Sequence, residues 1–515
     1  MSIEYLHNEI LDTVSEVAAD AAFDKRKIIS NIELILTYDS DALPKEVVSA
    51  LAAIRDSLVG TSFASRLKRY AGTDLLEDEI DRAGNEVDKT AEDIRRLASD
   101  ALRNPSDLRN ELAWLVTDDA RNGLRFGYAL SQQDTSSAAW PDILKAWRDA
   151  GDDAHDYFVG GYLRAIFERD PVRWETIIQD LSSVPTHVKF IPGLVWRSGM
   201  TERAARVLLD LAKAGKFSPQ SLNIFSMGQA AVPISDGLFG EWLDFLIGVR
   251  TFEAAATALH LASMSLLSKR QVSADQIRKV ITQPALLVRE SDHSHVMLAH
   301  DWLELAKALI KLDAANELTV LEILLESIGK RGAITDSLGP DGDRYLDRLV
   351  SRHPVETWRI VSELIQPPMD TRGFVITRWL RGDMGFDGPN PGPMRHIPRE
   401  EIWRWIAADT EKRAAYVART ASKDFDPTTW PASLIREVLC RFGDSNAVQS
   451  AVHANFLTGG WSGPASLHYR TEKDALVQMR TSETNPNALR WLNEAIKSTD
   501  VSIEQAKIEE ESRGY

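Results

Sequence analysis

Apolar residues recur every three or four positions along most of the chain, which is the spacing that places them on one face of an α-helix. Within residues 3–59 three such stripes follow one another, and each predicts one helix. The third stripe begins after Pro44, a residue that suits a helix start because it has no N–H to leave unpaired there. The N-terminal part of the chain is therefore predicted to be helical.

The segment 74–103 carries the longest stripe. Its small and apolar residues repeat at helical spacing: Ile80, Ala83, Val87, Ala91, Ile94, Leu97 and Ala101. The other positions are dense in Asp, Glu, Arg and Lys, as on a solvated helix face. The pattern predicts one charged helix of about 45 Å, at roughly 1.5 Å per residue, that packs on its neighbours. An N-terminal helical region over residues 1–103 is thus expected to end in this helix.

Residues 104–381 read as a series of shorter amphipathic helices bounded by Gly, Pro or polar caps. Two segments, 170–174 and 353–358, use the same device, in which a proline begins the helix and a tryptophan follows on the inward face. No alternating pattern of the kind that predicts β-hairpins persists anywhere. The sequence therefore predicts an all-α fold, an irregular α-solenoid of stacked helix pairs like those of HEAT or TPR proteins. Its period is irregular, so the repeat class stays open.

A run rich in Gly and Pro over residues 382–398 is the clearest break in the helical pattern. Trp379 precedes this break, and Trp403 and Trp405 follow it. Because large rings favour burial, we expect the run to be a connector pinned against a packed surface. Residues 399–515 are predicted to form a C-terminal helical cap. Its expected helices cover 399–408, 410–422, 428–442, 447–457, 467–481, 487–497 and 503–512.

The composition is that of a folded soluble protein, with 44% hydrophobic and 26% charged residues. The formal net charge of −16 argues against nonspecific binding to nucleic acids or anionic membranes as the main role. Cys440 is the single cysteine, which excludes an internal disulfide framework, and its apolar neighbours predict a buried thiol. The first residues lack a signal-peptide pattern, and no run of about 18 apolar residues occurs. A cytoplasmic protein without a membrane partner is expected.

The sequence lacks the glycine-rich loops that bind nucleotides. It contains neither a Gly-x-x-x-x-Gly-Lys-Ser/Thr phosphate loop nor a dinucleotide-type glycine fingerprint. Residues 460–463, Gly-Trp-Ser-Gly, match a nucleophile elbow only in part, because the second glycine comes one residue early and no strand pattern precedes it. These observations favour a non-catalytic chain without a cofactor.

One polar cluster nevertheless offers the ligands that borderline metal ions prefer. Its imidazoles and carboxylate are His260, His293, His295, His300 and Asp301. Neighbouring His-Asp pairs occur in HD-type phosphohydrolases, so a metal-dependent phosphohydrolase is an alternative interpretation. His295 and His300 are five residues apart, about 140° around a helix, which separates them unless the helix is kinked. A simple helix cap near Asp292 competes with the metal site.

Basic and aromatic residues gather near the C-terminus and around the connector. Near the C-terminus they are His468, Tyr469, Arg470, Lys473, Arg480, Arg490 and Trp491. Such a mixture is typical of surfaces that bind single-stranded nucleic acids, which is a second alternative. The same residue types also suit contacts within the fold or with an acidic segment of a partner. The predicted partner-binding residues are Trp379, Arg381, Arg395, Trp403, Trp461, His468 and Arg470.

Two stretches carry a resemblance to a known group of proteins. They are residues 379–420, beginning WLRGDMGFDGPNPGP, and residues 455–515, beginning NFLTGGWSGPASLHYR. In the placement of their Trp, Gly and Pro residues, these stretches resemble the C-terminal helical regions of large bacterial proteins associated with anti-phage defence. In those proteins a helical-repeat region commonly follows a nucleotide-hydrolysing or effector domain. This chain departs from that pattern, because no ATPase motif precedes its helices.

The resemblance implies either that a partner chain supplies catalysis or that this chain is the sensing and scaffolding part alone. No catalytic residue is carried over from it. We therefore expect a non-catalytic helical-repeat scaffold, sensor or adaptor of a bacterial anti-phage defence system. Its partner is expected to be another protein chain, such as an NTPase or an effector, in preference to nucleic acid.

Overall fold

The computed structural model describes the chain over residues 11–17, 25–60, 62–72, 78–80, 86–88, 90–227, 230–268, 270, 272–288, 296–365, 370–385, 388–422, 426–456 and 463–512. Over these residues the fold is all-α, with two short antiparallel β-hairpins between helices. Contacts divide the chain into two compact units. The first comprises Met1–Val249 and His260–Val272, and the second comprises Arg250–Leu259 and Ser273–Tyr515. Helix α14 (Phe252–Leu267) contributes residues to both.

The N-terminal helices of the first unit have a small core of their own. Ile32, Val47 and Leu51 are buried in it. The helices are α2 (Lys25–Tyr38), η1 (Ser40–Ala42), α3 (Lys45–Val59) and α4 (Phe63–Gly72). The predicted helical character is confirmed for these residues, and Pro44 stands immediately before α3 as expected.

The single helix predicted over residues 74–103 is wrong in its first half. Strands β1 (Asp78–Ile80) and β2 (Glu86–Asp88) pair there as an antiparallel hairpin, and helix α5 (Ala91–Arg103) follows them. The sequence between the strands contains Gly84-Asn85, a dipeptide that favours hairpin turns. This turn signal interrupts a spacing of apolar residues that would otherwise suit a helix. Within α5 the predicted stripe is buried, and it consists of Ile94, Leu97, Ala98 and Ala101.

From α5 onward, helices of the first unit pack on the next-but-one helix along the chain. Helix α5 packs on α7, α7 on α9 and α9 on α11, while α6 packs on α8 and α10 on α12. Their bounds are α6 (Pro105–Leu115), α7 (Gly123–Gln133), α8 (Trp140–Asp149), α9 (Tyr157–Arg169), α10 (Pro171–Ser182), α11 (Ile191–Ser198) and α12 (Glu202–Lys213). Short 3-10 turns are η2 (Gly151–Asp153), η3 (Val188–Phe190) and η4 (Pro219–Ser226), and α13 (Asp236–Val249) follows. Alternate helices therefore lie side by side.

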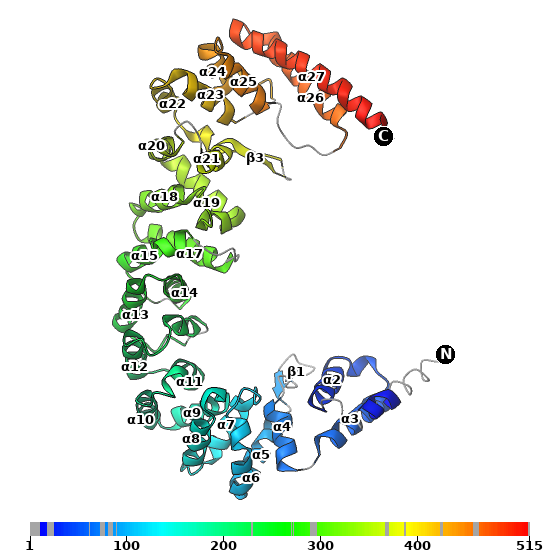
Figure 1. Ribbon diagram of the computed structural model, residues 1–515, viewed down its shortest axis with the longest axis vertical. Helices are drawn as coiled ribbons and strands as arrows, with labels where there is room; N and C mark the ends of the chain where they lie inside the picture. Colours follow the sequence, from blue (N-terminus) through cyan, green and yellow to red (C-terminus); the bar gives the residue numbers. More distant parts are fainter. Residues whose placement is uncertain are drawn as a thin grey trace. The chain divides into compact units, whose positions relative to one another are not determined.

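Helices α7 and α9 pack side by side (Figure 1), and glycines allow their backbones to approach closely. A Cβ atom on Gly127 would lie 2.2 Å from the carbonyl oxygen of Phe158, and one on Gly161 would lie 1.9 Å from that of Leu124. Both distances are far below van der Waals contact, so a larger residue does not fit unless the backbone moves. The rings of Phe126 and Phe158 stack beside this crossing, with centroids 5.9 Å apart. This helix pair therefore depends on glycine.

The same next-but-one packing recurs in the second unit. Helix α15 packs on α17, α18 on α20, α21 on α23 and α23 on α25. Its first helices are α15 (Ala274–Ile281), α16 (Pro284–Leu287), α17 (Val296–Leu312), α18 (Asn316–Ser327), α19 (Gly339–Arg352), α20 (Pro354–Leu364) and α21 (Thr371–Arg381), with η5 (Ile334–Ser337) before α19. The packing of each helix on its next-but-one neighbour therefore recurs within both units.

The pattern predicted at two helix starts, a proline followed by an inward-facing tryptophan, is confirmed. Pro171 begins α10 and Pro354 begins α20. The rings of Trp174 and Trp358 are buried, whereas the valine that follows each proline is exposed. Proline favours the start of a helix because its φ angle is already helical, and the tryptophan then fills the core one turn later.

The Gly- and Pro-rich run 382–398 contains a hairpin that the sequence did not predict. Strand β3 (Gly382–Gly385) pairs antiparallel with β4 (Gly388–Pro391), and the 3-10 turn η6 (Pro393–His396) follows. Strands made largely of Gly and Pro show no alternation of apolar and polar side chains, which explains why the pattern did not reveal them.

Contacts with α19 and α21 hold the connector in place. The N–H of Gly392 donates to the carbonyl oxygen of Arg381 at 3.0 Å. A Cβ atom on Gly392 would lie 2.2 Å from the carbonyl oxygen of Leu380, so the turn packs directly on the end of α21. Arg395 and His396 both reach Asp347 in α19, at 2.7 and 3.1 Å. The connector is therefore fastened by its own residues as well as by the flanking rings.

Among those flanking rings, Trp405 is the buried one. Its centroid lies 5.5 Å from that of Trp358 and 5.6 Å from that of Tyr416, both in edge-to-face geometry. Trp379 and Trp403 are only half-buried. The expectation that rings pin this region to a packed surface therefore holds best for Trp405, which lies on the inner face of its helix.

The C-terminal helices follow the predicted positions with two differences. They are α22 (Arg399–Ile406), α23 (Thr410–Thr420), α24 (Leu434–Phe442), α25 (Asn446–Phe456), α26 (Ala465–Ser482) and α27 (Pro486–Ser512). The helix predicted from residue 428 begins only at Leu434, after the 3-10 turn η7 (Trp430–Ala432). The last two predicted helices are one, because Thr499 in the polar stretch between them is buried and donates its hydroxyl to the Ala495 carbonyl at 2.8 Å. Helices α26 and α27 form an antiparallel pair (Figure 1).

Candidate functional site

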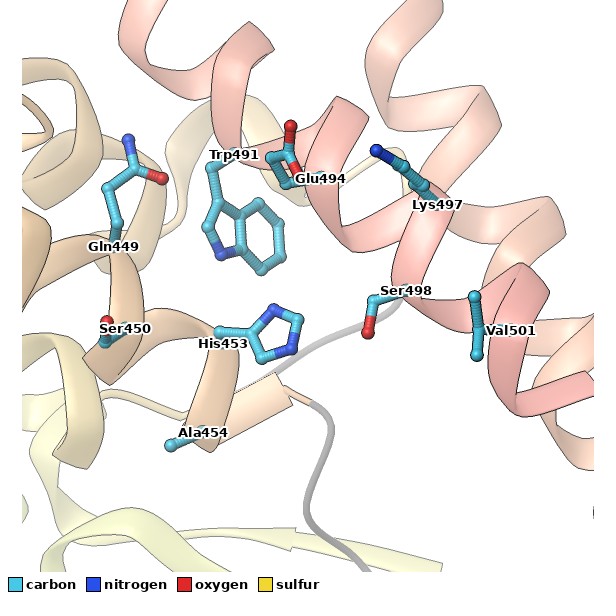
Figure 2. Close-up of a pocket in the computed structure, with 9 residues that line it drawn as sticks. All are labelled: Gln449, Ser450, His453, Ala454, Trp491, Glu494, Lys497, Ser498 and Val501. Carbon is cyan, nitrogen blue, oxygen red and sulfur yellow. The ribbon is translucent and has the colours of Figure 1, made fainter. Parts of the chain in front are cut away.

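An open groove of about 560 Å³ lies between α25 and α27 in the second unit (Figure 2). Its lining residues are Gln449, Ser450, His453, Ala454, Trp491, Glu494, Lys497, Ser498 and Val501. The volume falls within the range of about 300–1,000 Å³ that is usual for ligand pockets. We therefore treat this groove as the candidate functional site.

Helical periodicity places the lining residues on the groove. In α25 the buried positions are Val448, Ala451, Val452, Asn455 and Phe456, so the residues between them face outward. In α27 the buried positions include Trp491, Leu492, Ala495, Ile496 and Thr499. The groove is thus formed where the outward edges of two amphipathic helices meet.

Trp491 forms the floor of the groove. Its ring stacks on Trp430, with centroids 6.1 Å apart, and meets Phe456 edge to face at 4.9 Å. Only 1% of the residue is exposed, and its indole Nε1 has no hydrogen-bond partner among the described residues. Figure 2 shows this nitrogen on the edge of the ring turned toward α25, where Ser450 and His453 lie. A buried N–H without an acceptor costs about 1–3 kcal/mol, which the packing of the ring on Trp430 and Phe456 has to offset.

Polar side chains form the walls. In the part of the chain that the structure describes, Ser450, His453 and Lys497 make no side-chain hydrogen bond or ion pair. Lys497 and Glu494 stand on the rim as one base and one acid, and both are exposed. Val501 adds an apolar surface that is 54% exposed. The groove therefore offers hydrogen-bonding groups and a small apolar wall without a strong net charge.

A buried ion pair supports the floor from behind. Glu483, in the turn between α26 and α27, accepts from Arg436 Nε at 2.7 Å and from Trp430 Nε1 at 2.9 Å. The N–H groups of Thr484 and Asn485 also donate to it, each at 2.9 Å. Burial alone would raise the pKa of Glu483, but these hydrogen bonds lower it to about 2. The carboxylate thereby holds Trp430, on which Trp491 stacks.

A smaller groove of about 340 Å³ lies between α6 and α8 in the first unit. Its lining residues are Arg109, Leu112, Ala113, Asp142, Lys145, Ala146, Asp149 and Ala150. Arg109 Nε donates to Asp142 at 2.7 Å across it, in an exposed ion pair. Both grooves run between helices that lie side by side, but the smaller one lacks a buried polar atom without a partner among its lining residues.

The predicted partner-binding residues that the structure describes do not line either groove. Trp379 and Trp403 are half-buried, and the guanidinium of Arg441 lies 4.2 Å over the ring of Trp403. Arg381 is half-buried at the end of α21, and Arg395 is paired with Asp347. On α26, His468 lies 3.3 Å from Glu472 and Arg470 is exposed, while Trp461 falls outside the described residues. Their role in binding stays a prediction.

The predicted metal ligands are only partly described. His260 is half-buried in α14, His300 is exposed in α17, and Asp301 beside it is buried. His293 and His295 lie outside the described residues. Among the side chains that are described, no group of three or more His, Cys, Asp or Glu residues could hold a metal ion. Cys440, which the sequence predicted to be buried, is only half-buried, and burial raises the pKa of its thiol.

The C-terminal basic and aromatic residues do not form one surface for stacking bases. Trp491 is turned into the core. Lys473 pairs with Asp500 at 2.5 Å, and Arg490 lies 3.7 Å from Asp444. The sequence thus singled out Trp491 for its ring, whereas the structure packs that ring against Trp430 and Phe456.

Sequence reasoning missed the groove itself. Its residues on α25, from Gln449 to Ala454, carry no motif and were assigned only to a helix. The available signal was their position on the outward side of an amphipathic helix, yet such positions are usually solvated. Which outward face meets a neighbour depends on the packing of α25 against α27.

Comparison of the chain with protein-family models, with curated proteins and with solved structures finds no match. Within the described ranges, no single helix has both the length and the apolar composition needed to cross a membrane. The bent helix pair Lys45–Leu58 and Phe63–Gly72 meets those criteria only when its two pieces are taken together.

Proposed function

We propose that this protein is a helical-repeat scaffold or adaptor that binds another protein chain, with the α25–α27 groove as a contact site. The observation that carries this proposal is the open groove of about 560 Å³ between α25 and α27, along which Ser450, His453 and Lys497 make no side-chain hydrogen bond or ion pair among the described residues. Polar side chains without partners along an open groove are available to hydrogen-bond with a bound chain.

The packing of helices supports a scaffold of the α-solenoid type. In both units, helices lie beside their next-but-one neighbours, as in HEAT and TPR proteins. Solenoid proteins bind partners on the extended surfaces that such stacked helices form. The groove between α25 and α27 and the groove between α6 and α8 both lie between such next-but-one helices.

The resemblance of residues 379–420 and 455–515 to helical regions of anti-phage-defence proteins supports a place in bacterial defence. On this proposal the chain is the sensing or scaffolding part, and a separate NTPase or effector chain performs the chemistry. The groove lies within the second of these two stretches and the segment before it.

Site-specific photo-crosslinking in cells of the source tests the proposal. A benzophenone amino acid is placed at Ser450 in the groove and, as a control, at Thr176 on the outer face of α10. We expect one discrete crosslinked protein from position 450 that mass spectrometry identifies and that co-purifies stoichiometrically, and none from position 176. The proposal is wrong if position 450 yields no discrete product in cells in which the protein is expressed under phage challenge.

A further inference from the structure

We propose that His187 and Trp147 form a pH-sensitive latch, which opens on acidification and releases the connection between α10 and α11 from α8. The connection is residues 183–190, and the latch is the contact between these two rings. All of these residues belong to the first unit. The inference therefore goes beyond the proposed scaffold function and does not rest on the α25–α27 groove.

One tryptophan holds the connection in place. The ring of His187 stacks on that of Trp147, with centroids 4.5 Å apart and planes 11° apart, and the ring of Phe190 meets Trp147 at 5.2 Å. Trp147 is itself fixed, because its Nε1 donates to the carbonyl oxygen of His155 at 3.0 Å. Half of the residues of the connection are exposed, so the contacts with Trp147 provide much of its attachment.

The closed latch favours the neutral form of His187. The residue is 2% exposed, and neither ring nitrogen has a hydrogen-bond partner among the described residues. Protonation would give the ring two N–H donors and a charge, and burying a charge without a partner is costly. In keeping with this geometry, burial and the charge of Arg148 lower the pKa of His187. In the open state the solvated ring takes up its proton near the usual value of about 6.5.

The charged groups around the ring do not compensate for a proton on it. On the elements packed there they include Arg148 on α8, Asp152 on η2, His155 before α9, Asp180 on α10 and Lys189 on the connection itself. The charge of Arg148 repels an imidazolium. Asp152 is engaged with Lys189 at 3.1 Å, in an exposed ion pair of the kind that contributes little to stability. His155 Nδ1 lies 3.2 Å from Asp156, and the first turn of α11 carries no charge.

The latch is therefore closed at neutral pH and opens as the pH falls. Above about pH 6.5 the ring is neutral in both states, and below it the open state binds a proton more readily than the closed state. Between pH 7.5 and pH 5.5 this difference raises the equilibrium constant for opening by up to about tenfold. Opening uncovers the ring of Trp147, which is 1% exposed in the closed state.

Hydrogen–deuterium exchange of the full-length protein, measured by mass spectrometry, tests the latch. The N–H of His187 donates to the carbonyl oxygen of Val184 and the N–H of Phe190 to that of His187, each at 2.9 Å. Both amides exchange when the connection opens. Exchange is measured at pH 7.5 and pH 5.5 and corrected for the chemical effect of pH on free amides. Peptides covering 183–190 are compared with peptides of α9.

We expect the protection of 183–190 to fall by several-fold, up to about tenfold, between pH 7.5 and pH 5.5, while α9 keeps its protection. His187→Phe keeps a ring on Trp147 but cannot titrate, so it should abolish this response. His300→Gln replaces an exposed histidine of α17 and is the matched control, which should respond as the wild type does.

An equal loss of protection in 183–190 and in α9 would mean general unfolding and would overturn the inference. An unchanged response in His187→Phe would assign the effect to another group and would overturn it too. If His187→Phe does not fold, His187→Gln, which is uncharged at both pH values, takes its place. Crosslinking at Ser450 concerns the second unit, so its outcome decides the scaffold proposal separately.

Discussion

Arg436 and Glu483 form a two-pronged ion pair that joins α24 to the turn between α26 and α27. Arg436 Nε donates to one carboxylate oxygen at 2.7 Å and Nη2 donates to the other at 3.0 Å. The carboxylate side chain is fully buried, and it also accepts from Trp430 Nε1. Residues far apart in sequence thus fix the tryptophan on which the floor of the groove rests.

Substituting Glu483→Gln should therefore lower the free energy of unfolding by about 3 kcal/mol, because Arg436 loses its charge partner while buried polar groups lose acceptors. Urea denaturation at pH 7 measures the change. Glu504→Gln, which removes an exposed pair with Lys507 on α27, is the matched control and should have little effect. Equal effects of both substitutions would contradict this account.

The pH dependence of stability follows from the same carboxylate. Its folded-state pKa of about 2 lies below the usual value of 4.5, so its stabilising contribution is complete above about pH 4.5 and is lost as the pH falls toward 2. We expect the wild-type protein to lose more stability than Glu483→Gln over this interval. Denaturation midpoints measured between pH 5 and pH 2.5 check the difference, and parallel curves would argue against it.

His187 should produce a second pH dependence at higher pH. It is 2% exposed, stacks on Trp147 at 4.5 Å, and neither ring nitrogen has a partner among the described residues. Burial and the charge of Arg148 lower the pKa of His187. Its neutral form is therefore favoured by folding, and stability should fall as the pH drops below the usual histidine value of about 6.5.

The substitution His187→Phe removes the titrating group while keeping a ring against Trp147. We expect its stability at pH 7.5 to equal or exceed that of the wild type, since an apolar ring replaces unpaired polar atoms. Its melting temperature should change less than that of the wild type between pH 7.5 and pH 5.5. A variant that loses stability in parallel with the wild type would show that other groups cause the change.

The glycine crossing of α7 and α9 predicts a large effect from a single methyl group. A Cβ atom at Gly161 would lie 1.9 Å from the Leu124 carbonyl oxygen, so Gly161→Ala should destabilise the protein by about 3 kcal/mol. Gly248→Ala is the control, because nothing lies within 4 Å of a Cβ atom there. That control should be neutral or slightly stabilising, as alanine favours helices more than glycine does. Thermal melts of both variants compare the two sites.

The rings around the connector should differ in their contribution to stability. Trp405→Ala removes a buried ring that contacts Trp358 and Tyr416, so a loss of about 3–5 kcal/mol is expected. Trp379→Ala and Trp403→Ala remove half-buried rings and should cost clearly less. Chemical denaturation of the three variants ranks them, and a larger loss at Trp379 than at Trp405 would refute the assignment.

Much of the helical structure was predictable from local pattern. The spacing that predicts helices at 410–422 and 447–457 is confirmed to within a few residues by α23 and α25. Pro171 with Trp174 and Pro354 with Trp358 likewise behave as expected. These features depend on interactions within about one turn of helix, so nearby residues alone determine them.

Other features required knowledge of distant contacts. The helix over 487–512 continues through a polar stretch because Thr499 is buried by packing, which its own sequence neighbours do not reveal. Trp405, and not Trp403 or Trp379, enters the core because Trp358 and Tyr416 surround it. Periodicity predicts which face of a helix is buried, but the helix that packs on that face depends on residues elsewhere in the chain.

By itself, the sequence determined an all-α protein with a Gly- and Pro-rich break at 382–398 and tryptophans turned inward at two helix starts. Only the tertiary structure decided that α27, with Trp491, forms a groove with α25. These two helices are separated in the sequence by α26 and by the turn that contains the buried carboxylate of Glu483. Local backbone preferences act over a single turn of helix. Burial and pairing of polar groups act between segments that only folding brings together.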